Sequence, residues 1–272
     1  MVGNIGIITG KGNLPILLAN NISKTYKDTK IFAIGFSGET NQRIKKFVNE
    51  FYRIPFGSFG KLLEYLNLKN IKKVLMAGLV SHKRLFDKNP KLDEHAKKIF
   101  ENIKDNKADS ILGSIANELE KSGIEVLPML DFLKDDIAEE GVLTITEPDQ
   151  NQKQDIQFGF EIAKELSRLD IGQTIVVKNR CIVAVESIEG TDLCLLRAGK
   201  LARENTVVIK IAKFHQDPRF DLPIVGPKTI KIMKMIKSKV LAIEAGKTCI
   251  IDKEKVLQLA NKYGISIIGL KR

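Results

Sequence analysis

Residues 5–15 have the sequence IGIITGKGNLP, in which an apolar run leads into two glycines around a lysine and then into a proline. The run at 5–8 predicts a short buried strand, and residues 14–24 predict a helix. Pro15 suits the first turn of that helix, where its missing N–H costs nothing. A strand that turns through glycines into a helix opens an α/β sheet, so this stretch indicates the fold class.

The rest of the first half continues this alternation. We expect strands at 30–35, 47–54, 73–77 and 124–127, and helices at 60–66, 92–104 and 109–121. Strands that alternate with helices need crossover connections, so the sheet should be mainly parallel. The segment 134–154 differs, because it is rich in Asp, Glu and Gln and has little apolar periodicity. We predict a linker there, between an N-terminal domain at 1–133 and a C-terminal domain at 155–272.

The second half predicts another α/β domain, with some antiparallel pairing. Helices are expected at 155–169, 192–203, 227–238 and 253–262, and strands at 173–178, 182–187, 207–211, 240–243, 248–251 and 266–268. Asn179 and Arg180 separate two of these strands, which predicts a hairpin, because Asn tolerates a positive φ.

Composition limits the class of protein. The 272 residues fit two domains, and 43% hydrophobic with 28% charged residues indicates a globular chain. No apolar run approaches the roughly 18 to 20 residues of a membrane span. Residues 2–10 lack a basic region and a cleavage site, so we expect a cytoplasmic protein without a signal peptide. The three cysteines have no metal-type spacing and are expected to be buried, and no histidine pattern indicates zinc.

The net charge of +11 favours an acidic partner, such as a nucleic acid, an anionic membrane surface or a phosphorylated substrate. The lysines are spread along the chain, aromatic residues make up only 6%, and there is no Trp. We therefore expect no nucleic-acid partner. In the helix predicted at 227–238, Lys231, Lys234 and Lys237 share one side. This helix is either an ordinary amphipathic surface helix or a basic face that meets an anionic membrane.

Two glycine segments follow predicted strands. Glycines at 10 and 12 allow close approach of a ligand, and the next helix N-terminus favours an anion. The alternative is a tight turn without a ligand. Gly78 begins a similar segment, GLVSH at 78–82, where a plain strand-to-loop glycine is the alternative. The acid-rich segment at 186–192 contains Thr191 and Asp192, either of which suits a helix N-cap.

The loop at 213–223 is the densest in polar groups. Pro218 and Pro223 exclude a regular helix, so the loop should be stiff and irregular. Asp217 and Asp221 offer oxygen ligands of the kind that Mg²⁺ prefers, while Lys213 and Arg219 could bind phosphate oxygens. The alternative is a surface loop held by internal salt bridges.

Four motifs together resemble the UDP-2,3-diacylglucosamine pyrophosphatases of lipid A biosynthesis, the metal-dependent type unrelated to calcineurin-like phosphoesterases. The most specific parts of the resemblance are GKGNLP at 10–15, ESIEGTD at 186–192 and QDPRFDLP at 216–223, and EAG at 244–246 also fits. The resemblance spans essentially the whole chain. Phe214 and His215 depart from it, because the family usually has Pro and a small residue there, and His82 stands where the family usually has Arg.

The resemblance implies a Rossmann-like N-terminal domain, a distinct C-terminal α/β domain, and Mg²⁺, with Mn²⁺ as a second option. It implies hydrolysis of a lipid-linked UDP-sugar to UMP and 2,3-diacylglucosamine 1-phosphate. It also implies a homodimer and a position in the cytoplasm at the inner membrane. Asp221 is the residue most tied to catalysis, and Asp217 is the second carboxylate of the catalytic and metal sites. The predicted substrate-binding residues are Gly10, Lys11, Gly12, Leu14, Pro15, Gly78, Glu189, Gly190, Thr191, Asp192, Lys213, Gln216 and Arg219.

Two other functions are compatible with parts of the sequence. One is a sugar-nucleotide or dinucleotide-binding oxidoreductase, which needs an acid near the end of the second strand, where only Glu39 qualifies. The other is a non-catalytic module that binds nucleotides or membranes through its basic surface. The acids at 186–192 argue against this second function.

Overall fold

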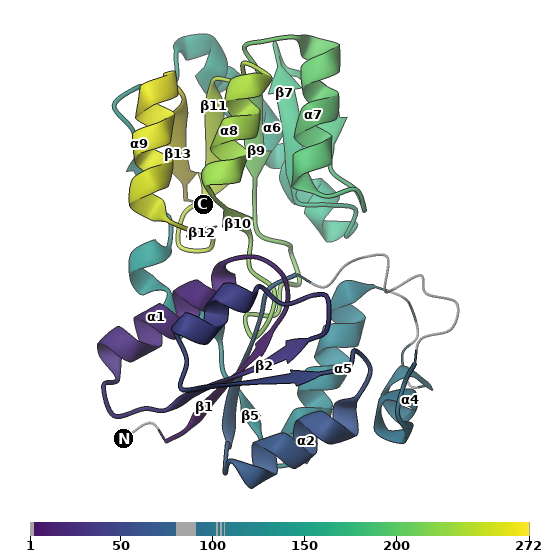
Figure 1. Ribbon diagram of the computed structural model, residues 1–272. Coiled ribbons are helices and arrows are strands. Elements are labelled where there is room, and N and C mark those ends of the chain that lie inside the picture. The colour runs from purple at the N-terminus through teal and green to yellow at the C-terminus, as the bar shows by residue number, and fades with distance from the viewer. Residues whose placement is uncertain (1–2, 80–90, 102, 104, 106, 272) are drawn as a thin grey trace. The chain divides into compact units, whose positions relative to one another are not determined.

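The computed structural model describes residues 3–79, 91–101, 103, 105 and 107–271. The chain forms two compact units (Figure 1). The first unit consists of Met1–Leu133 and Asp217–Asp221, and the second of Lys134–Gln216 and Leu222–Arg272. Residues 217–221 therefore belong to the first unit, although they lie far along the chain. The expected class, α/β with two domains, is confirmed.

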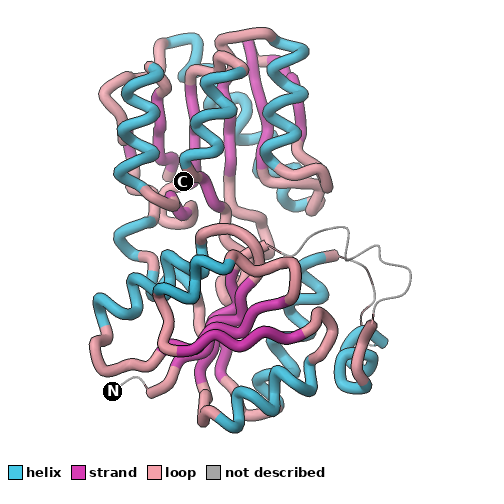
Figure 2. The backbone as a smooth tube through the Cα atoms, in the orientation of Figure 1, coloured by secondary structure: helices cyan, strands magenta, loops and turns pink. Residues whose placement is uncertain are grey.

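The first unit contains a five-stranded parallel sheet (Figure 2). Its order is β3-β2-β1-β4-β5, the order of the Rossmann fold, whose ligands bind where the strand order reverses. That reversal lies between β1 and β4. The strands are β1 (Ile5–Thr9), β2 (Ile31–Phe36), β3 (Glu50–Ile54), β4 (Lys73–Ala77) and β5 (Glu125–Val126).

Helices bury the apolar strands of this sheet. Ile8, Ile34 and Val74 of the strands share one hydrophobic cluster with Leu66 of α2 and Leu119 of α5. All five residues of β1 are buried, as expected for a strand covered on both faces. The helical elements are α1 (Leu14–Thr25), η1 (Gln42–Lys46), α2 (Phe59–Leu68), α4 (Glu94–Glu101), α5 (Ala108–Lys121) and η2 (Met129–Phe132).

The second unit has a six-stranded mixed sheet, in the order β6-β13-β11-β9-β7-β8. The central strands β9, β11 and β13 are parallel, while β7, β8 and β6 are antiparallel to their neighbours. The strands are β6 (Gly141–Val142), β7 (Thr174–Lys178), β8 (Cys181–Val185), β9 (Val207–Lys210), β11 (Val240–Glu244) and β13 (Ser266–Leu270). A separate parallel pair joins β10 (Ile224–Val225) and β12 (Cys249–Ile250).

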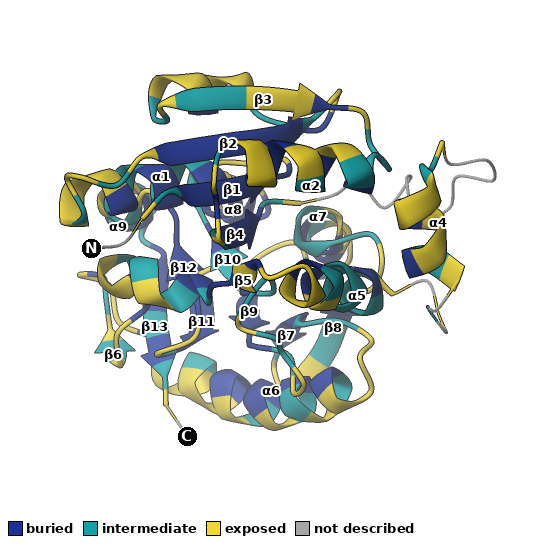
Figure 3. Ribbon diagram, turned by 90° about the horizontal axis from the view of Figure 1, so that it is seen from below, coloured by how far each residue is buried: buried dark blue, intermediate teal, exposed yellow. Residues whose placement is uncertain are grey.

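Both faces of this sheet are covered (Figure 1). Val177 and Ile209 pack with α6 (Gln150–Arg168), whereas Val176 and Val208 pack with α7 (Thr191–Ala202), α8 (Pro227–Met235) and α9 (Lys253–Tyr263). Successive residues of a strand point to opposite faces, so these alternating residues belong to two cores. Buried and exposed residues alternate along α6, as its colouring shows (Figure 3).

The hairpin between β7 and β8 follows the prediction. Asn179 and Arg180 have φ values of 50° and 57°, which match the twist of a tight two-residue hairpin. The carboxylate of Asp155 accepts the N–H of Asn179 at 2.9 Å and that of Arg180 at 2.6 Å. Asp155 is itself buried, so helix α6 fixes the turn.

Two expectations differ from the structure. The segment 134–154 belongs to the second unit, where Gly141–Val142 adds an edge strand to β13 and α6 already begins at Gln150. Short polar segments of this kind resemble linkers in sequence, because two-residue strands show no periodicity. Among the cysteines, Cys194 and Cys249 are buried as expected, but Cys181 is exposed because it begins an edge strand at the hairpin.

Candidate active site

The β1–α1 turn and the residues after β4 lie against each other at the carboxyl ends of neighbouring strands. Lys11 N–H donates to the Leu79 carbonyl oxygen at 2.7 Å, and Leu79 N–H donates back to Lys11 at 3.0 Å. A Cβ on Gly10 would lie 2.6 Å from the Leu79 oxygen. Gly78 has a φ of +96°, and a Cβ there would lie 2.7 Å from the Lys11 oxygen. Both glycines therefore let two backbone turns pack together.

This contact lies where the strand order reverses, between β1 and β4. Ligands of open α/β sheets bind outside this end of the strands. Gly12 has a φ of +95° and open space where a Cβ would be. Asn13, the N-cap of α1, makes no side-chain bond to the helix, so the end of the helix is available to an anion. The glycine turn has both a packing role at Gly10 and an open surface at Gly12.

Polar residues after β2 hold this turn. Glu39 Oε2 lies 3.1 Å from Lys11 Nζ, and the Glu39 side chain is only 5% exposed. Asn41 Nδ2 donates to Asn13 Oδ1 at 3.1 Å. An oxidoreductase of this fold would need Glu39 for a ribose hydroxyl, but here Glu39 is buried against Lys11. The geometry therefore argues against the oxidoreductase interpretation.

Two other predicted binding residues, Leu14 and Pro15, begin α1 and are buried, with Leu14 only 3% exposed. Their contact with a substrate stays a prediction. Residues 80–82 of the GLVSH motif lie outside the described residues.

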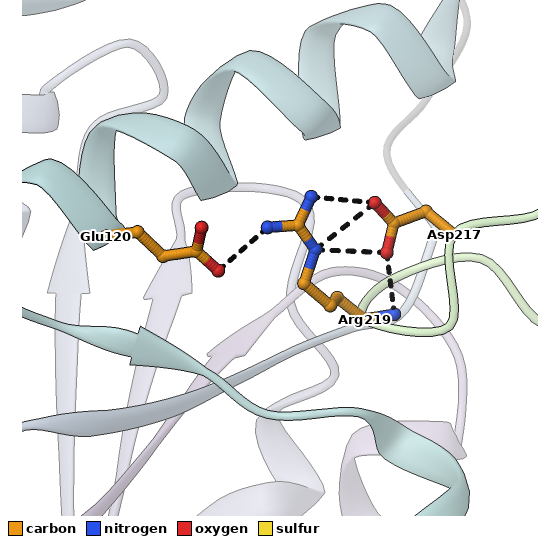
Figure 4. A network of polar contacts seen from close by, with 3 residues as sticks. All are labelled: Glu120, Asp217 and Arg219. Carbon is orange, nitrogen blue, oxygen red and sulfur yellow. Dashed lines mark hydrogen bonds and ion pairs between the residues drawn. The ribbon is translucent and has the colours of Figure 1, made fainter.

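An arginine fork organises the segment 217–221 (Figure 4). Arg219 Nη2 donates to Asp217 Oδ2 at 2.7 Å, and Arg219 Nε donates to both oxygens of Asp217 at 3.0 and 3.2 Å. Arg219 Nη1 donates to Glu120 Oε1 on α5 at 2.7 Å. The backbone oxygen of Pro218 accepts the N–H of Met129 at 3.2 Å. These bonds attach the segment to the first unit.

This pairing changes the roles of two predicted site residues. The hydrogen bonds that Arg219 donates hold the pKa of Asp217 below its ordinary value, and the carboxylates of Asp217 and Glu120 that accept them raise the pKa of Arg219. Both Asp217 oxygens and three Arg219 nitrogens are thus already engaged. Asp217 does not fit the second metal ligand that we expected, and Arg219 does not fit a free phosphate clamp. Together they form a brace that shapes the loop.

Asp221 lies at the end of this braced turn. Its N–H donates to the carbonyl oxygen of Asp217 at 2.9 Å, and its Oδ2 atom is shielded from solvent. Phe220 packs into the core cluster beneath, close to Gly113 of α5. The backbone of Asp221 is therefore held from its N-terminal side. Among the described residues, no group of three or more His, Cys, Asp or Glu side chains is arranged to hold a metal.

The first part of the predicted loop belongs to the second unit. Lys213 Nζ lies 3.6 Å from Asp170 Oδ1, at the end of α6. Gln216 Nε2 is buried and has no hydrogen-bond partner among the described residues. The motif at 213–223 is thus divided between the units, with Lys213 and Gln216 in the second and Asp217, Arg219 and Asp221 in the first.

The acid-rich segment before α7 also has internal partners. Glu189 Oε1 accepts from Arg197 Nη2 at 2.6 Å, and this bond lowers the pKa of Glu189. Asp192 Oδ2 lies 2.6 Å from Lys228 Nζ. Gly190 is the N-cap of α7 and has a φ of +81°, which a side chain would strain. Glu189 and Asp192 therefore stabilise the turn, and of the four predicted residues it is Thr191 that enters a buried polar cluster.

That cluster contains a lysine that our sequence analysis missed. Lys210, the last residue of β9, is buried and donates to Thr191 Oγ1 at 2.7 Å. Thr191 in turn donates to Glu186 Oε1 at 2.9 Å, while Glu186 Oε2 is buried and lacks a partner among the described residues. Thr174 lies 3.4 Å from Thr191, hydroxyl to hydroxyl. A buried ammonium and carboxylate joined through one hydroxyl form a polar group at the carboxyl end of the parallel strands, where ligands bind.

A second buried carboxylate controls the start of the 212–223 loop. Glu244 ends β11, and its Oε2 accepts the N–H of Ala212 at 3.0 Å. Its Oε1 lies 2.8 Å from Lys164 Nζ and 2.8 Å from Lys247 Nζ. Burial opposes ionisation of Glu244, but these three partners outweigh it, so its pKa is lowered. Glu244 therefore fixes the position of Ala212, where the loop begins after β9.

The two units correspond to two known domains. The family model of the LpxI N-terminal domain matches residues 4–135, and that of the LpxI C-terminal domain matches residues 139–268. The chain belongs to the LpxI family. The UDP-2,3-diacylglucosamine pyrophosphatase LpxI of Caulobacter vibrioides is 28% identical over 283 residues, which cover 98% of this chain and 97% of that protein.

The match to LpxI confirms the resemblance drawn from the four motifs. It spans both domains, so no large part of the chain lies outside the family. Within the described residues, no helix combines the length and apolar character that a membrane crossing needs.

The buried charges Lys210 and Glu244, the second of which lies in the EAG motif, share one signal in the sequence. Lys210 and Glu244 each stand at the end of an otherwise apolar strand, with VVI before Lys210 and VLAI before Glu244. A single charge that ends a buried strand is seldom tolerated without a partner. Sequence alone could have indicated both residues, but not their partners Thr191, Ala212 and Lys164.

Proposed function

We propose that this chain hydrolyses the pyrophosphate bond of UDP-2,3-diacylglucosamine, giving UMP and 2,3-diacylglucosamine 1-phosphate for lipid A biosynthesis. The observation that carries the proposal is the match of both domains to LpxI, together with a relative of that name over 98% of the chain. The reaction consumes one water and breaks one P–O bond of the anhydride. Its substrate is both a nucleotide and a lipid, so the protein must bind a diphosphate and acyl chains.

The residues of the chain suit such a displacement. Phosphoryl transfer needs positioning and positive charge more than covalent participation by the protein. The braced loop presents Asp221, a carboxylate with one shielded oxygen, and we propose that Asp221 orients the attacking water. The open turn at Gly12 and the N-terminus of α1 offer backbone donors to an anion. Lys213 and Thr191 remain proposed contacts for the polar part of the substrate.

Mg²⁺ is part of this proposal, with Mn²⁺ as the alternative ion. When bound, it would neutralise phosphate charge and lower the pKa of a coordinated water. The donor set that we favour is Asp221 with oxygens of the diphosphate, because Mg²⁺ commonly uses one or two carboxylates together with substrate phosphates. Asp217 is left out of this set, since both of its oxygens accept bonds from Arg219.

The remaining proposals concern partners and location. We propose that the protein works in the cytoplasm at the inner membrane as a homodimer, as its motifs led us to expect. Light scattering of the purified protein at several concentrations tests this proposal. A dimer should have twice the 30.4 kDa mass of one chain. A mass of one chain at every concentration would contradict it.

The decisive experiment for the activity is product analysis. The purified protein is incubated with UDP-2,3-diacylglucosamine and Mg²⁺, with and without EDTA, and the products are separated. UMP that appears only without the chelator supports the reaction and the metal together. UMP that is still formed in EDTA supports the reaction but contradicts the proposed role of the metal. The absence of UMP under every condition would overturn the proposed function and favour a binding module.

A further inference from the structure

Positive charge is distributed unequally over the two faces of the second sheet. Helices α7, α8 and α9 together contain eight Lys or Arg residues and two Asp or Glu residues, whereas α6 on the other face contains three of each. The three helices thus hold a net charge of +6, and α6 has none. Two of the eight cations pair with acids outside these helices, Arg197 with Glu189 and Lys253 with Glu139.

Seven of these eight basic residues are exposed, whereas Lys253 is half-buried and paired with Glu139. Lys231 and Lys234 are exposed on α8, and their helix neighbours Ile230 and Met233 are buried against the sheet. Lys200 is exposed on α7, as are Lys255 and Lys262 on α9. The three helices lie side by side, with α8 in contact with both others (Figure 1). They form one continuous basic face.

Large aliphatic side chains lie among these lysines. Leu201 is 65% exposed beside Lys200, and Met235 is 63% exposed beside Lys234. Leu193 is 56% exposed two turns before Lys200 on the same helix. Exposed apolar groups between cations mark a surface that meets both charge and hydrocarbon.

We propose that the face formed by α7, α8 and α9 binds the surface of a bilayer that contains anionic lipids. The lysines would meet the lipid head groups, and Leu193, Leu201 and Met235 would enter the interface. Nucleic acid suits this face less well, because single strands stack on aromatic rings and the strongly exposed hydrophobic side chains of these helices are aliphatic. The choice of a membrane as partner rests on the proposed lipid substrate, whereas the location of the face rests on charge and exposure.

Vesicle binding tests the proposal with three substitutions, Lys200→Gln, Lys231→Gln and Lys234→Gln, combined in one variant. Vesicles of phosphatidylcholine with phosphatidylglycerol are sedimented with the full-length protein, and vesicles of phosphatidylcholine alone serve as the uncharged reference. Each cation near an anionic surface contributes roughly fivefold to binding, so the variant should bind the anionic vesicles about 100-fold more weakly. None of the three lysines is a proposed contact of the substrate.

The matched control removes three exposed lysines from the first unit, with Lys24→Gln, Lys27→Gln and Lys30→Gln combined. It lowers the net charge by the same amount and should keep binding within about threefold. If both variants lost vesicle binding equally, the net charge alone would explain the effect, and the proposal would be overturned. Failure of the native protein to bind anionic vesicles would also overturn it, as would tighter binding to single-stranded RNA through the same lysines.

A second variant tests the apolar part. Leu193→Ser with Leu201→Ser changes two exposed side chains and should keep the fold, yet weaken binding to anionic vesicles by at least about tenfold. Native-like binding by this variant would remove the inserted groups from the proposal. Vesicle binding is measured without substrate, so its outcome stays separate from that of the proposed activity. Where UMP is formed, the lysine variant should hydrolyse detergent-dispersed substrate at the native rate and membrane-embedded substrate more slowly.

Discussion

The two sheets differ in the groups that close the carboxyl ends of their central strands. In the first unit the strand ends of β1 and β4 are joined by backbone, with Gly10 and Gly78 in a contact that leaves no space for side chains. In the second unit the ends of β9 and β11 are closed by buried charges, Lys210 and Glu244, which hold Thr191 and the backbone of Ala212. The first edge leaves backbone donors for an anion, whereas the second edge fixes the start of a loop.

This difference indicates how side chains hold one irregular loop in place. The segment 212–223 begins at Ala212, held by Glu244, and its portion 217–221 is braced by Arg219 in the other unit. A loop with two prolines has no regular hydrogen bonds of its own, so side chains must supply the order. The following substitutions test how the two edges differ.

Asp221→Ala should have the largest effect. It removes the proposed water-orienting group and should lower turnover about 10³-fold or more, while the unfolding midpoint stays near that of the native protein. Turnover is measured by UMP release. Asp131→Ala, which removes an exposed carboxylate of the same unit, is the control and should remain active. A native rate in Asp221→Ala would exclude its catalytic role.

Glu244→Ala should come next, with a loss of about 3 to 5 kcal/mol in the free energy of unfolding. It leaves Lys164 partly buried without its anion and releases the N–H of Ala212. Glu244→Gln keeps an acceptor for Ala212 and should lose less. Urea denaturation compares the two with Glu189→Ala, whose partner Arg197 is half-exposed. A Glu244→Ala variant as stable as Glu189→Ala would show that the second edge does not depend on buried charge.

Gly78→Ala tests the first edge. The alanine would have to keep an unfavourable positive φ, and its Cβ would lie against the Lys11 oxygen. We therefore expect the free energy of unfolding to fall by roughly 1 to 3 kcal/mol. Gly123→Ala is the matched control, because Gly123 also has a positive φ, +76°, but nothing lies within 4 Å of the Cβ. The difference between the two variants isolates the backbone contact. Equal losses would attribute the whole effect to φ.

Asp217→Asn should have the smallest effect, on the order of 1 kcal/mol, and one that depends on pH. The pKa of Asp217 in the folded protein is below its ordinary value of 3.8, so its stabilising contribution is complete above about pH 4. The contribution is lost as the pH falls through the folded pKa. The native protein should therefore lose stability more steeply than Asp217→Asn between about pH 4 and pH 2. Parallel curves in acid denaturation would contradict the brace.

Local sequence patterns predicted most of the secondary structure. The strand at 73–77 and the helices that begin at residues 14, 227 and 253 agree with the structure, and so does the positive φ of Asn179. Each depends on the periodicity or the turn preference of neighbouring residues, which a single chain displays directly. The two-residue strand at 224–225 was missed because it is too short to show a period, and the strand at 141–142 overlaps at Val142 with a short extended piece expected at 142–146 in the linker.

The sequence by itself determined the fold class, the positions of the motifs and, through their resemblance, the family. It identified Asp217 and Arg219 as charged residues of a stiff loop, but their chemistry was decided by tertiary structure. Arg219 meets Glu120, 99 positions earlier in the chain, and Lys210 meets Thr191 across two elements. Local patterns specify the preference of the backbone and the side of an element that is buried, whereas the pairing of distant charges follows only from how the elements pack.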